Sequence, residues 1–284
     1  MRWQNRRLSD NVEDRRGGGG MGTRLGVGGG IGGIIIVVLA LLFNRDPQQV
    51  LQQVQQGSGG STQSEQVTDS SDETARFAST VLADTEDVWK KLFSEMHKTY
   101  QEPGMVIYSD VDQSGCGSAQ AAMGPFYCPA DEKVYLDLSF FNEMEKRFHV
   151  VGDFAMAYVI AHEVGHHVQN MLGITKKMDA MRSRLSEEEY NKLSVKLELQ
   201  ADFLAGVWAH HAQKMQNILE AGDIEEALNA ASAVGDDKLQ KAAQGYVVPD
   251  AFTHGTSAQR MKWFKKGFES GDIKDGDTFN TTEL

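Results

Sequence analysis

Two histidines and a glutamate, in the segment His162-Glu163-Val164-Gly165-His166, have the residue types and spacing of a zinc site. In a helix, residues four positions apart lie on one face, so His162 and His166 can bind the same metal ion. Glu163 stands beside them, where its carboxylate can hold a water molecule at the metal and accept its proton. This H-E-x-x-H pattern predicts a Zn2+ site that still needs a third protein ligand and an open fourth position.

The segment 198–202 contains the best candidate for the third ligand. A metzincin would have a third histidine six residues after the second, but Leu172 occupies that position. Glu198 and Asp202 are four apart on one helix face, among residues that are apolar almost all round, and buried carboxylates need a cation or donors. We expect Glu198 to complete a His2Glu site and Asp202 to accept the outer N–H of a ligand histidine. The alternative is that both are ordinary acids on a helix surface.

His167 follows His166 directly but lies about 100° further round a helix. It cannot share the same ion without distortion, so we expect it beside the site or at the surface.

The other candidate site residues, His162, Glu163, His166 and Glu198, predict hydrolysis of a polypeptide substrate. A water activated at the metal attacks a peptide carbonyl, and Glu163 passes its proton to the leaving amine. The alternative is a non-catalytic periplasmic interaction module stapled by zinc, which a fourth protein ligand such as His254 or a cysteine would favour.

The elements that must position these residues follow from the hydrophobic pattern. Helical spacing predicts helices over residues 73–96, 152–172, 186–215, 223–233 and 257–268. Ser186 and Glu189 have the spacing of a capping box at the start of the third helix. Strand patterns cover residues 105–108, 126–128 and 134–138, the last two as a hairpin, while the boundaries within 235–244 stay open. The predicted fold class is a mostly helical α+β domain with a small sheet.

Cys116 and Cys128 are the two cysteines of the chain and fall in the same loop-and-hairpin region. If the domain lies outside the cytoplasm, we expect them to form a disulfide. The rival interpretation is a metal site, but a second pair of thiols is absent from the sequence.

The N-terminal quarter of the sequence indicates a membrane anchor. Residues 1–24 are basic and glycine-rich and predict a disordered cytoplasmic tail. Residues 25–43 are uncharged and about long enough to cross a bilayer as one helix, and residues 44–72 have the composition of a flexible linker. A cleaved signal peptide is the alternative, but no small-x-small site follows Phe43. We expect a single-pass protein of the bacterial inner membrane, with residues 73–284 in the periplasm or outside the cell.

The charge distribution excludes nucleic acid as a partner. The whole chain has a formal net charge of -12, although residues 1–24 contain six arginines against three acids. The main domain is therefore strongly acidic, whereas phosphate binding needs a basic face.

The sequence resembles the bacterial neutral zinc metallopeptidase family (YpfJ-like). The resemblance covers nearly the whole chain except residues 44–72. Its motifs are the segments 162–167, 198–202, Gly124-Pro125-Phe126-Tyr127-Cys128-Pro129, Thr253-His254-Gly255-Thr256-Ser257 and the opening Met1-Arg2-Trp3-Gln4 with residues 10–16. It implies a zincin-like fold and a membrane-anchored metallopeptidase.

The sequence is also remotely similar to HtpX-type membrane metalloproteases. In their E-x-x-A-D pattern the Glu is the third zinc ligand, which implies this role for Glu198. Their T-H-P-x-x-x-x-R segment is matched by Thr253, His254 and Arg260, with Gly255 in place of the proline. The similarity implies that His254 or Arg260 donates to the oxyanion or braces the metal-binding helix. Alternatively, His254 caps the following helix and Arg260 pairs with a surface acid.

Two further features of the site stay open on the sequence alone. Tyr158, Tyr190 and Tyr246 are other possible donors to the oxyanion, with nothing to separate them. Zincin proteases usually bind the substrate backbone along an edge strand, and residues 134–140 are the predicted one. A purely structural hairpin, held by the disulfide, is the alternative.

Overall fold

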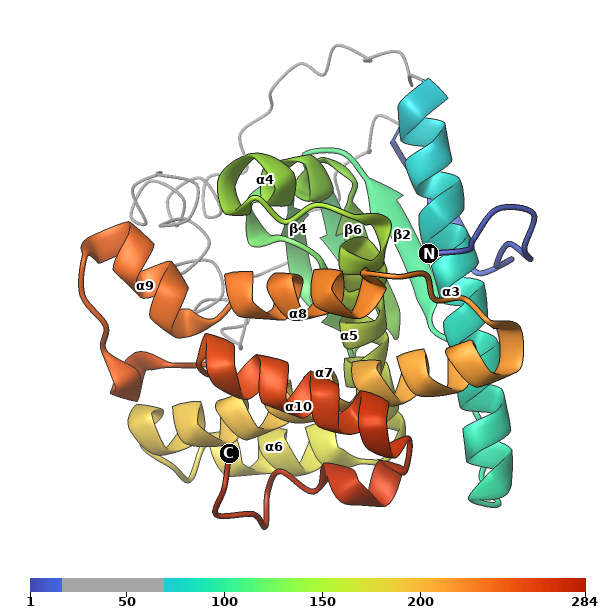
Figure 1. Cartoon of the computed structure of the whole chain (residues 1–284). Coiled ribbons are helices and arrows are strands. Elements are labelled where there is room, and N and C mark those ends of the chain that lie inside the picture. Colours follow the sequence, from blue (N-terminus) through green and yellow to red (C-terminus); the bar gives the residue numbers. More distant parts are fainter. Residues whose placement is uncertain (17–68) are drawn as a thin grey trace.

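The computed structural model describes residues 1–16 and 69–284 of the chain (Figure 1). Within them the structure is mostly helical with two small sheets, which confirms the predicted α+β class. The helices are α3 (Asp69–Glu95), α4 (Ser139–Phe148), α5 (Asp153–Met171), α6 (Ile174–Arg182), α7 (Glu187–Gln216), α8 (Asp223–Ala233), α9 (Asp236–Gln244) and α10 (Ser257–Ser270). Three short 3-10 turns are η1 (Ala121–Met123), η2 (Pro249–Ala251) and η3 (Ile273–Gly276).

The larger sheet has four strands in the order β1 (Val12–Asp14), β2 (Gly104–Tyr108), β6 (Lys133–Asp137) and β5 (Phe126–Cys128). The first three run parallel, and β5 pairs antiparallel with β6 as the predicted hairpin. A separate hairpin joins β3 (Val111–Ser114) and β4 (Gly117–Gln120). The strand β5 is therefore one edge of the larger sheet.

The helix α5 lies at the centre of the molecule, in contact with the sheet strands β5 and β6 and with helices α3, α7 and α8 (Figure 1). Its residues are apolar on most sides, so it is buried along nearly its whole length. Phe154 of α5 is fully buried and stacks on Trp208 of α7, which is fully buried as well. Because α5 is buried at the centre of the molecule, the polar side chains of its H-E-x-x-H motif need partners within the core.

Close helix contacts at three glycines set the arrangement of the helices around the motif. A Cβ on Gly165 of α5 would stand 3.0 Å from the carbonyl oxygen of Ala201 on α7. A Cβ on Gly206 would lie 2.1 Å from the carbonyl oxygen of Phe264, and one on Gly267 would lie 2.0 Å from a backbone oxygen of α7. Backbone contact at these points brings α7 against both α5 and α10. The space beside Gly165 is thus filled by helix α7.

The predicted helix boundaries agree with the structure to within a few residues. The capping box of Ser186 and Glu189 is present at the start of α7. Thr256 and Gln259 form a second capping box at the start of α10, so the N-cap of this helix is Thr256 and not His254. In the segment left open, 235–244, residues 236–244 form α9 and Gly235 is its N-cap. The elements β1, β3, β4, α4 and α6 were not predicted.

Residues 1–16 are folded, which corrects the prediction of a disordered tail for this part of residues 1–24. Met1 is buried, with 4% of its surface exposed, and residues 12–14 form the strand β1 beside β2. The prediction was wrong because it used the local composition, in which arginines and glycines predominate. The partners that order this segment are far away in sequence, on α3, β2 and α8.

The predicted substrate strand, residues 134–140, is corrected as well. The strand β6 ends at Asp137 and is hydrogen-bonded on both sides, to β2 and to β5, so it has no free edge. Residues 139–148 are the helix α4. Periodicity in the sequence shows that a segment is a strand but not where the strand lies within its sheet.

Within the described residues, we find no helix that combines the length and the apolar character needed to cross a membrane. The predicted membrane helix, residues 25–43, lies outside the described residues, as does most of the predicted linker. The last four linker residues, 69–72, belong to α3.

Candidate metal centre

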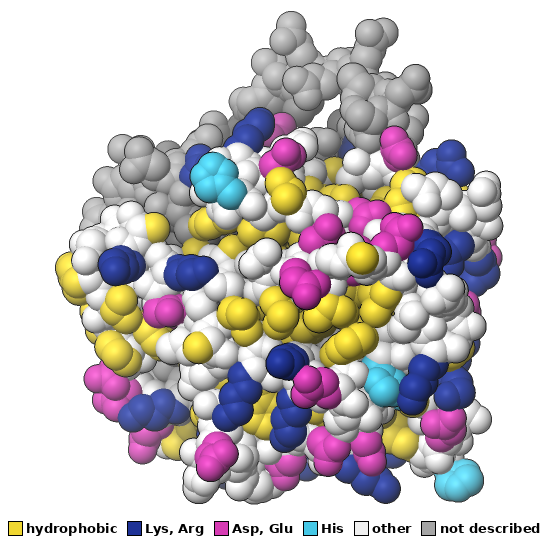
Figure 2. All heavy atoms as spheres, in the orientation of Figure 1, with side chains coloured by type: hydrophobic (Ala, Val, Ile, Leu, Met, Phe, Trp, Pro, Cys, Tyr) yellow, Lys and Arg dark blue, Asp and Glu magenta, His cyan; other side chains and the backbone are white. Residues whose placement is uncertain are grey.

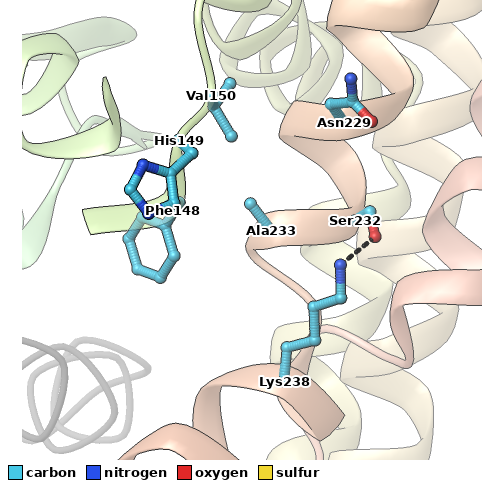
Figure 3. Close-up of a pocket in the computed structure, with 7 residues that line it drawn as sticks. All are labelled: Phe148, His149, Val150, Asn229, Ser232, Ala233 and Lys238. Carbon is cyan, nitrogen blue, oxygen red and sulfur yellow. Dashed lines mark hydrogen bonds between the residues drawn. The ribbon is translucent and has the colours of Figure 1, made fainter. Parts of the chain in front are cut away.

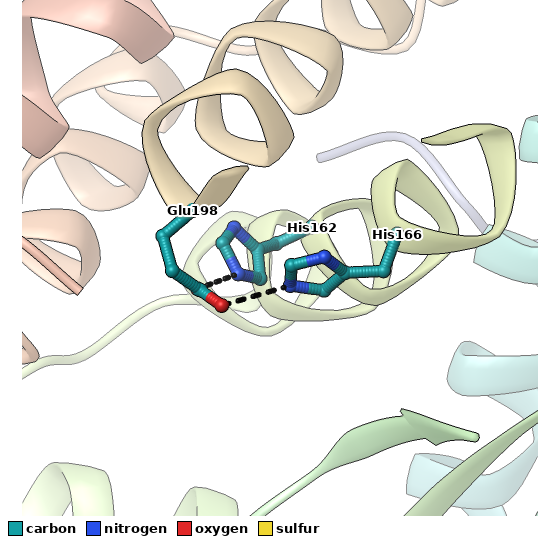
Figure 4. A group of neighbouring side chains, drawn as sticks. All are labelled: His162, His166 and Glu198. Carbon is teal, nitrogen blue, oxygen red and sulfur yellow. Dashed lines mark hydrogen bonds and ion pairs between the residues drawn. The ribbon is translucent and has the colours of Figure 1, made fainter. Parts of the chain in front are cut away.

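Helices α5 and α7 bring together the three predicted ligands. His162 and His166 project from one face of α5, and Glu198 reaches toward both rings from α7 (Figure 4). Glu198 Oε2 lies 3.2 Å from Nε2 of His162, and Oε1 lies 3.5 Å from Nε2 of His166. Their candidate donor atoms all lie within 4.8 Å of one another.

This spacing fits a tetrahedral zinc ion. Ligand distances of about 2.0–2.2 Å at tetrahedral angles put neighbouring donor atoms roughly 3.3–3.5 Å apart. The two Glu198 contacts, 3.2 and 3.5 Å, are close to these values. Two neutral imidazoles and a carboxylate are also the donor set that zinc takes in catalytic sites with a fourth position left open. The residues present therefore fit the metal.

The outer nitrogens of both histidines are held by acceptors. Nδ1 of His162 lies 2.9 Å from Oδ1 of Asp202, and Nδ1 of His166 lies 2.9 Å from Oε1 of Gln169. Gln169 is itself fixed, because its amide donates to the carbonyl of Leu197 on α7. With Nδ1–H donated to these oxygens, Nε2 of each ring is directed toward Glu198 with its lone pair available to a metal. Gln169 was not predicted, although its position three residues after His166 is a signal that could have found it.

Asp202 is completely buried and accepts from three donor groups besides Nδ1 of His162. Nε and a terminal nitrogen of Arg260 lie 2.8 and 2.9 Å from its two oxygens, and the hydroxyl of Tyr158 donates to it. Burial alone would raise the pKa of Asp202, but Arg260 and then His162 lower it to about 2. The carboxylate is thus ionised, as a stable acceptor for His162 requires. Arg260 is 4% exposed and also donates to the hydroxyl of Tyr158 on α5, so the alternative of a surface ion pair is excluded.

The charges within the metal centre favour ionised Glu198. Burial would raise the pKa of Glu198, but His166 and His162 hold it well below its usual range. Burial would lower the pKa of His162, whereas Asp202 and Glu198 raise it to about 10. In the metal-free protein, a proton on the histidines thus compensates the carboxylates. A divalent cation would replace that proton, so metal binding should release protons.

Glu163 is buried beside the two histidines, with 9% of its surface exposed. Burial raises its pKa, although His162 and His166 oppose this shift. The backbone of Tyr127, in the edge strand β5, also opposes the effect of burial and lowers the pKa of Glu163. A carboxyl group with a raised pKa is suited to accept and return a proton near neutral pH.

His254 is held in place by Asp236, a residue that the sequence analysis missed. Nδ1 of His254 lies 3.1 Å from Oδ1 of Asp236, and the other carboxylate oxygen accepts three consecutive backbone N–H groups, from Thr253, His254 and Gly255. Burial would lower the pKa of His254, but Asp236 raises it, with a further contribution from Glu198. His254 is not in the group of donor atoms around Glu198. Asp236 stands at the start of α9, whose boundaries the sequence left open.

His167 is buried and does not reach the metal group. Its Nε2 lies 2.7 Å from the carbonyl oxygen of Gln101, which requires a proton on that nitrogen, and its Nδ1 lies 2.9 Å from the hydroxyl of Tyr127. Burial lowers its pKa. The ring is thus neutral and connects α5 to the edge strand β5. The alternative of a surface position is excluded, because His167 is fully buried.

The three candidate tyrosines differ in their surroundings. The hydroxyl of Tyr158 already donates to Asp202, so it belongs to the support of His162. The hydroxyl of Tyr190 is buried without a hydrogen-bond partner, whereas Tyr246 is 62% exposed in the loop after α9. The hydroxyl of Tyr127, which was not among the predicted donors, is hydrogen-bonded to both His167 and Asn170 of α5.

Two surface cavities lie away from the three donor residues. One, of about 280 Å³, is lined by residues of α4, α8 and α9, where the ammonium of Lys238 donates to Ser232 over 2.6 Å (Figure 3). The other, of about 570 Å³, lies beside α4 and the end of β6. Neither contains His162, His166 or Glu198 among its lining residues.

Cys116 and Cys128 form the predicted disulfide, with their Cα atoms 5.8 Å apart. It connects the turn between β3 and β4 to the end of the edge strand β5. Cys128 is fully buried in a small second core with Tyr108 and Tyr135. The rival metal site for these thiols is thereby excluded.

A helix with two histidines, crossed by a second helix with a glutamate and an aspartate, forms a candidate zinc site. The chain belongs to the family described as "Putative neutral zinc metallopeptidase", whose model matches residues 1–279. It is 52% identical over 286 residues to the uncharacterized protein YpfJ of Escherichia coli strain K12, covering 98% of this chain and 99% of that protein. It is 41% identical over 207 residues to the uncharacterized protein Rv2575 of Mycobacterium tuberculosis strain H37Rv, covering 69% and 68% of the two chains. No solved structure matches the chain.

Proposed function

We propose that this protein is a zinc-dependent peptidase, with His162, His166 and Glu198 as the metal ligands. The observation that carries the proposal is the distance of 3.2 to 3.5 Å between each histidine Nε2 and the Glu198 carboxylate. The family to which the chain belongs supports the same activity. The likeness to HtpX-type metalloproteases stays a prediction.

The residues of the chain divide the chemistry between them. Zinc, when bound, would acidify a water molecule and polarise the carbonyl of the scissile peptide. Glu163 takes the proton from the attacking water and delivers it to the leaving amine. Its burial supports this role, because a carboxylate deprived of solvent takes up a proton more readily.

His254 is proposed to donate a hydrogen bond to the carbonyl oxygen as negative charge develops there. Asp236 favours the protonated imidazolium and orients its ring, which supports donation rather than metal binding. Arg260 has a different task, since both carboxylate oxygens of Asp202 already engage its guanidinium. It acts through Asp202 on the orientation of His162.

The substrate backbone is proposed to bind along β5, by addition of an antiparallel strand. Among the described residues this strand has one unpaired edge and contacts α5, and its Tyr127 backbone lowers the pKa of Glu163. Attachment to the inner membrane through residues 25–43, with the catalytic domain outside the cytoplasm, completes the proposal. The disulfide supports an oxidising compartment.

The decisive experiment is a comparison of the wild-type chain with Glu163→Gln. We expect both to retain about one zinc per chain, measured by elemental analysis, and only the wild type to cleave a library of unstructured peptides. Loss of cleavage without loss of zinc assigns the proton-transfer step to Glu163. Equal cleavage by both proteins would refute it.

The alternative function is a zinc-stapled interaction module without catalytic activity. In that case the wild-type chain would bind zinc and leave every peptide intact. A fourth protein ligand would accompany it, and X-ray absorption of the zinc-loaded protein would detect that ligand. Among the described residues, the group of donor atoms at this site has three members, which favours the peptidase.

A further inference from the structure

The first sixteen residues are an integral part of the catalytic domain. The strand β1 extends the sheet by parallel pairing with β2, with Val12 opposite Met105 and Asp14 opposite Ile107. At the other end of the segment, the backbone N–H of Arg2 donates to the carbonyl of Ile218 over 2.8 Å. The contacts therefore extend from the sheet, along α3, to the loop before α8 (Figure 1).

Two buried carboxylates of α3 depend on this segment for their partners. A terminal nitrogen of Arg6 lies 2.6 Å from Asp84, which is 2% exposed. Glu86, which is 1% exposed, accepts from Arg7 over 2.9 Å and from Asn11 over 2.9 Å. Buried charges left without partners cost several kcal/mol, so α3 is adapted to a bound N-terminal segment.

The arginines that predicted a cytoplasmic tail are used in ion pairs. Arg6 and Arg7 bind acids of α3, and Arg15 binds both Glu13 and Asp112 of the β3 strand. In the folded protein their charge is therefore compensated by acids, most of them on the domain. The basic composition of the segment has an explanation other than retention in the cytoplasm.

We propose that residues 1–16 and residues 69–284 lie in the same compartment, which is incompatible with a single membrane crossing between them. One crossing would separate the two partners by a hydrocarbon layer about 30 Å thick. Direct contacts such as the 2.6 Å ion pair between Arg6 and Asp84 are incompatible with that separation. Attachment at one face of the bilayer, or an even number of crossings, satisfies the contacts.

The disulfide identifies the compartment as an oxidising one. Cys116 and Cys128 belong to the same folded unit as β1, because β1 and β5 are strands of one sheet. A disulfide persists outside the cytoplasm and is rare within it. The N-terminal segment then lies on the periplasmic or external side together with the metal centre. This inference does not depend on peptidase activity.

The first test is a disulfide cross-link within the full-length chain, which is expressed in bacteria and analysed in their membranes. The backbone N–H of Ser9 lies 3.1 Å from Oγ of Ser79 on α3, and both residues are buried. We expect the double variant Ser9→Cys with Ser79→Cys to form a disulfide between these positions, detected by mass spectrometry of non-reduced peptides. The single variants Ser9→Cys and Ser79→Cys are matched controls that change the same atoms without a partner thiol.

The second test uses surface positions and does not require a new disulfide. Leu8 is 44% exposed and Met215, at the end of α7, is 40% exposed. We expect Leu8→Cys and Met215→Cys to react equally with a membrane-impermeant maleimide in intact spheroplasts. If Met215→Cys reacts and Leu8→Cys reacts only after the membranes are opened, the proposal is overturned. It is overturned equally if the thiols at positions 9 and 79 both stay free in the double variant.

Discussion

Asp202 accepts a hydrogen bond from Nδ1 of His162 over 2.9 Å, although the two residues are forty positions apart on different helices. The same carboxylate is engaged by Arg260 of α10. Three helices thus meet at one buried aspartate, and the orientation of the His162 ring, a candidate metal ligand, depends on all of them. The buried ion pair between Asp202 and Arg260 also orients His162. We therefore expect zinc affinity to depend on how these helices pack.

We therefore expect Asp202→Asn to weaken zinc binding by about 10–100-fold, because an amide cannot supply the same charged acceptor to His162. The loss should be measured by competition with a chromophoric zinc chelator. The matched control is Asp277→Asn, in the exposed turn after η3, which should bind zinc as the wild type does. An unchanged affinity of Asp202→Asn would contradict the orienting role.

Glu198→Ala should remove most of the bound zinc from the purified protein, since it deletes the third ligand and leaves two imidazoles. Elemental analysis after desalting measures the zinc-to-protein ratio. Glu187→Ala is the control, because Glu187 is exposed in the first turn of the same helix. Full zinc in Glu198→Ala would mean that another residue is the third ligand.

The pair of His254 and Asp236 predicts a specific pH dependence. Asp236 raises the pKa of His254, so a function that needs the imidazolium persists to higher pH and is lost as pH rises through that pKa. In Asp236→Asn the alkaline limb of kcat should move to lower pH. His254→Gln should lower kcat by about 10²–10³-fold with little change in KM.

Zinc content separates this effect from damage to the metal centre. Both variants should keep about one zinc per chain, because His254 is not in the group of donor atoms. Peptide cleavage over a pH series, with zinc measured in each sample, is the test. Parallel loss of zinc and activity in His254→Gln would instead indicate that the residue supports the metal.

Arg6→Ala should lower the free energy of unfolding by about 3 kcal/mol, because it leaves the buried carboxylate of Asp84 without its charged partner. Chemical denaturation of the detergent-solubilised full-length chain measures the change. Leu8→Ala, at an exposed position of the same segment, should have a much smaller effect. If the two variants were equally stable, residues 1–16 would contribute little to the domain.

The local features of the site could be predicted from the sequence because they depend on spacing along one helix. His162, Glu163 and His166 share a turn of α5, and Glu198 and Asp202 share a turn of α7, as the period of 3.6 residues requires. The main helices and the β5–β6 hairpin followed from hydrophobic periodicity in the same way. The disulfide followed from there being only one possible pair of cysteines.

Relationships between distant segments could be decided only by the tertiary structure. Asp236 orients His254 from a separate helix, β6 is an inner strand because β2 covers its second edge, and Arg6 finds its partner on α3. None of these has a signal in local composition, since each depends on which surfaces pack together when the core forms. The sequence by itself determined the candidate metal ligands and the helices that carry them. Packing determined which residues support them, which strand is free, and that the basic N-terminal segment is part of the domain.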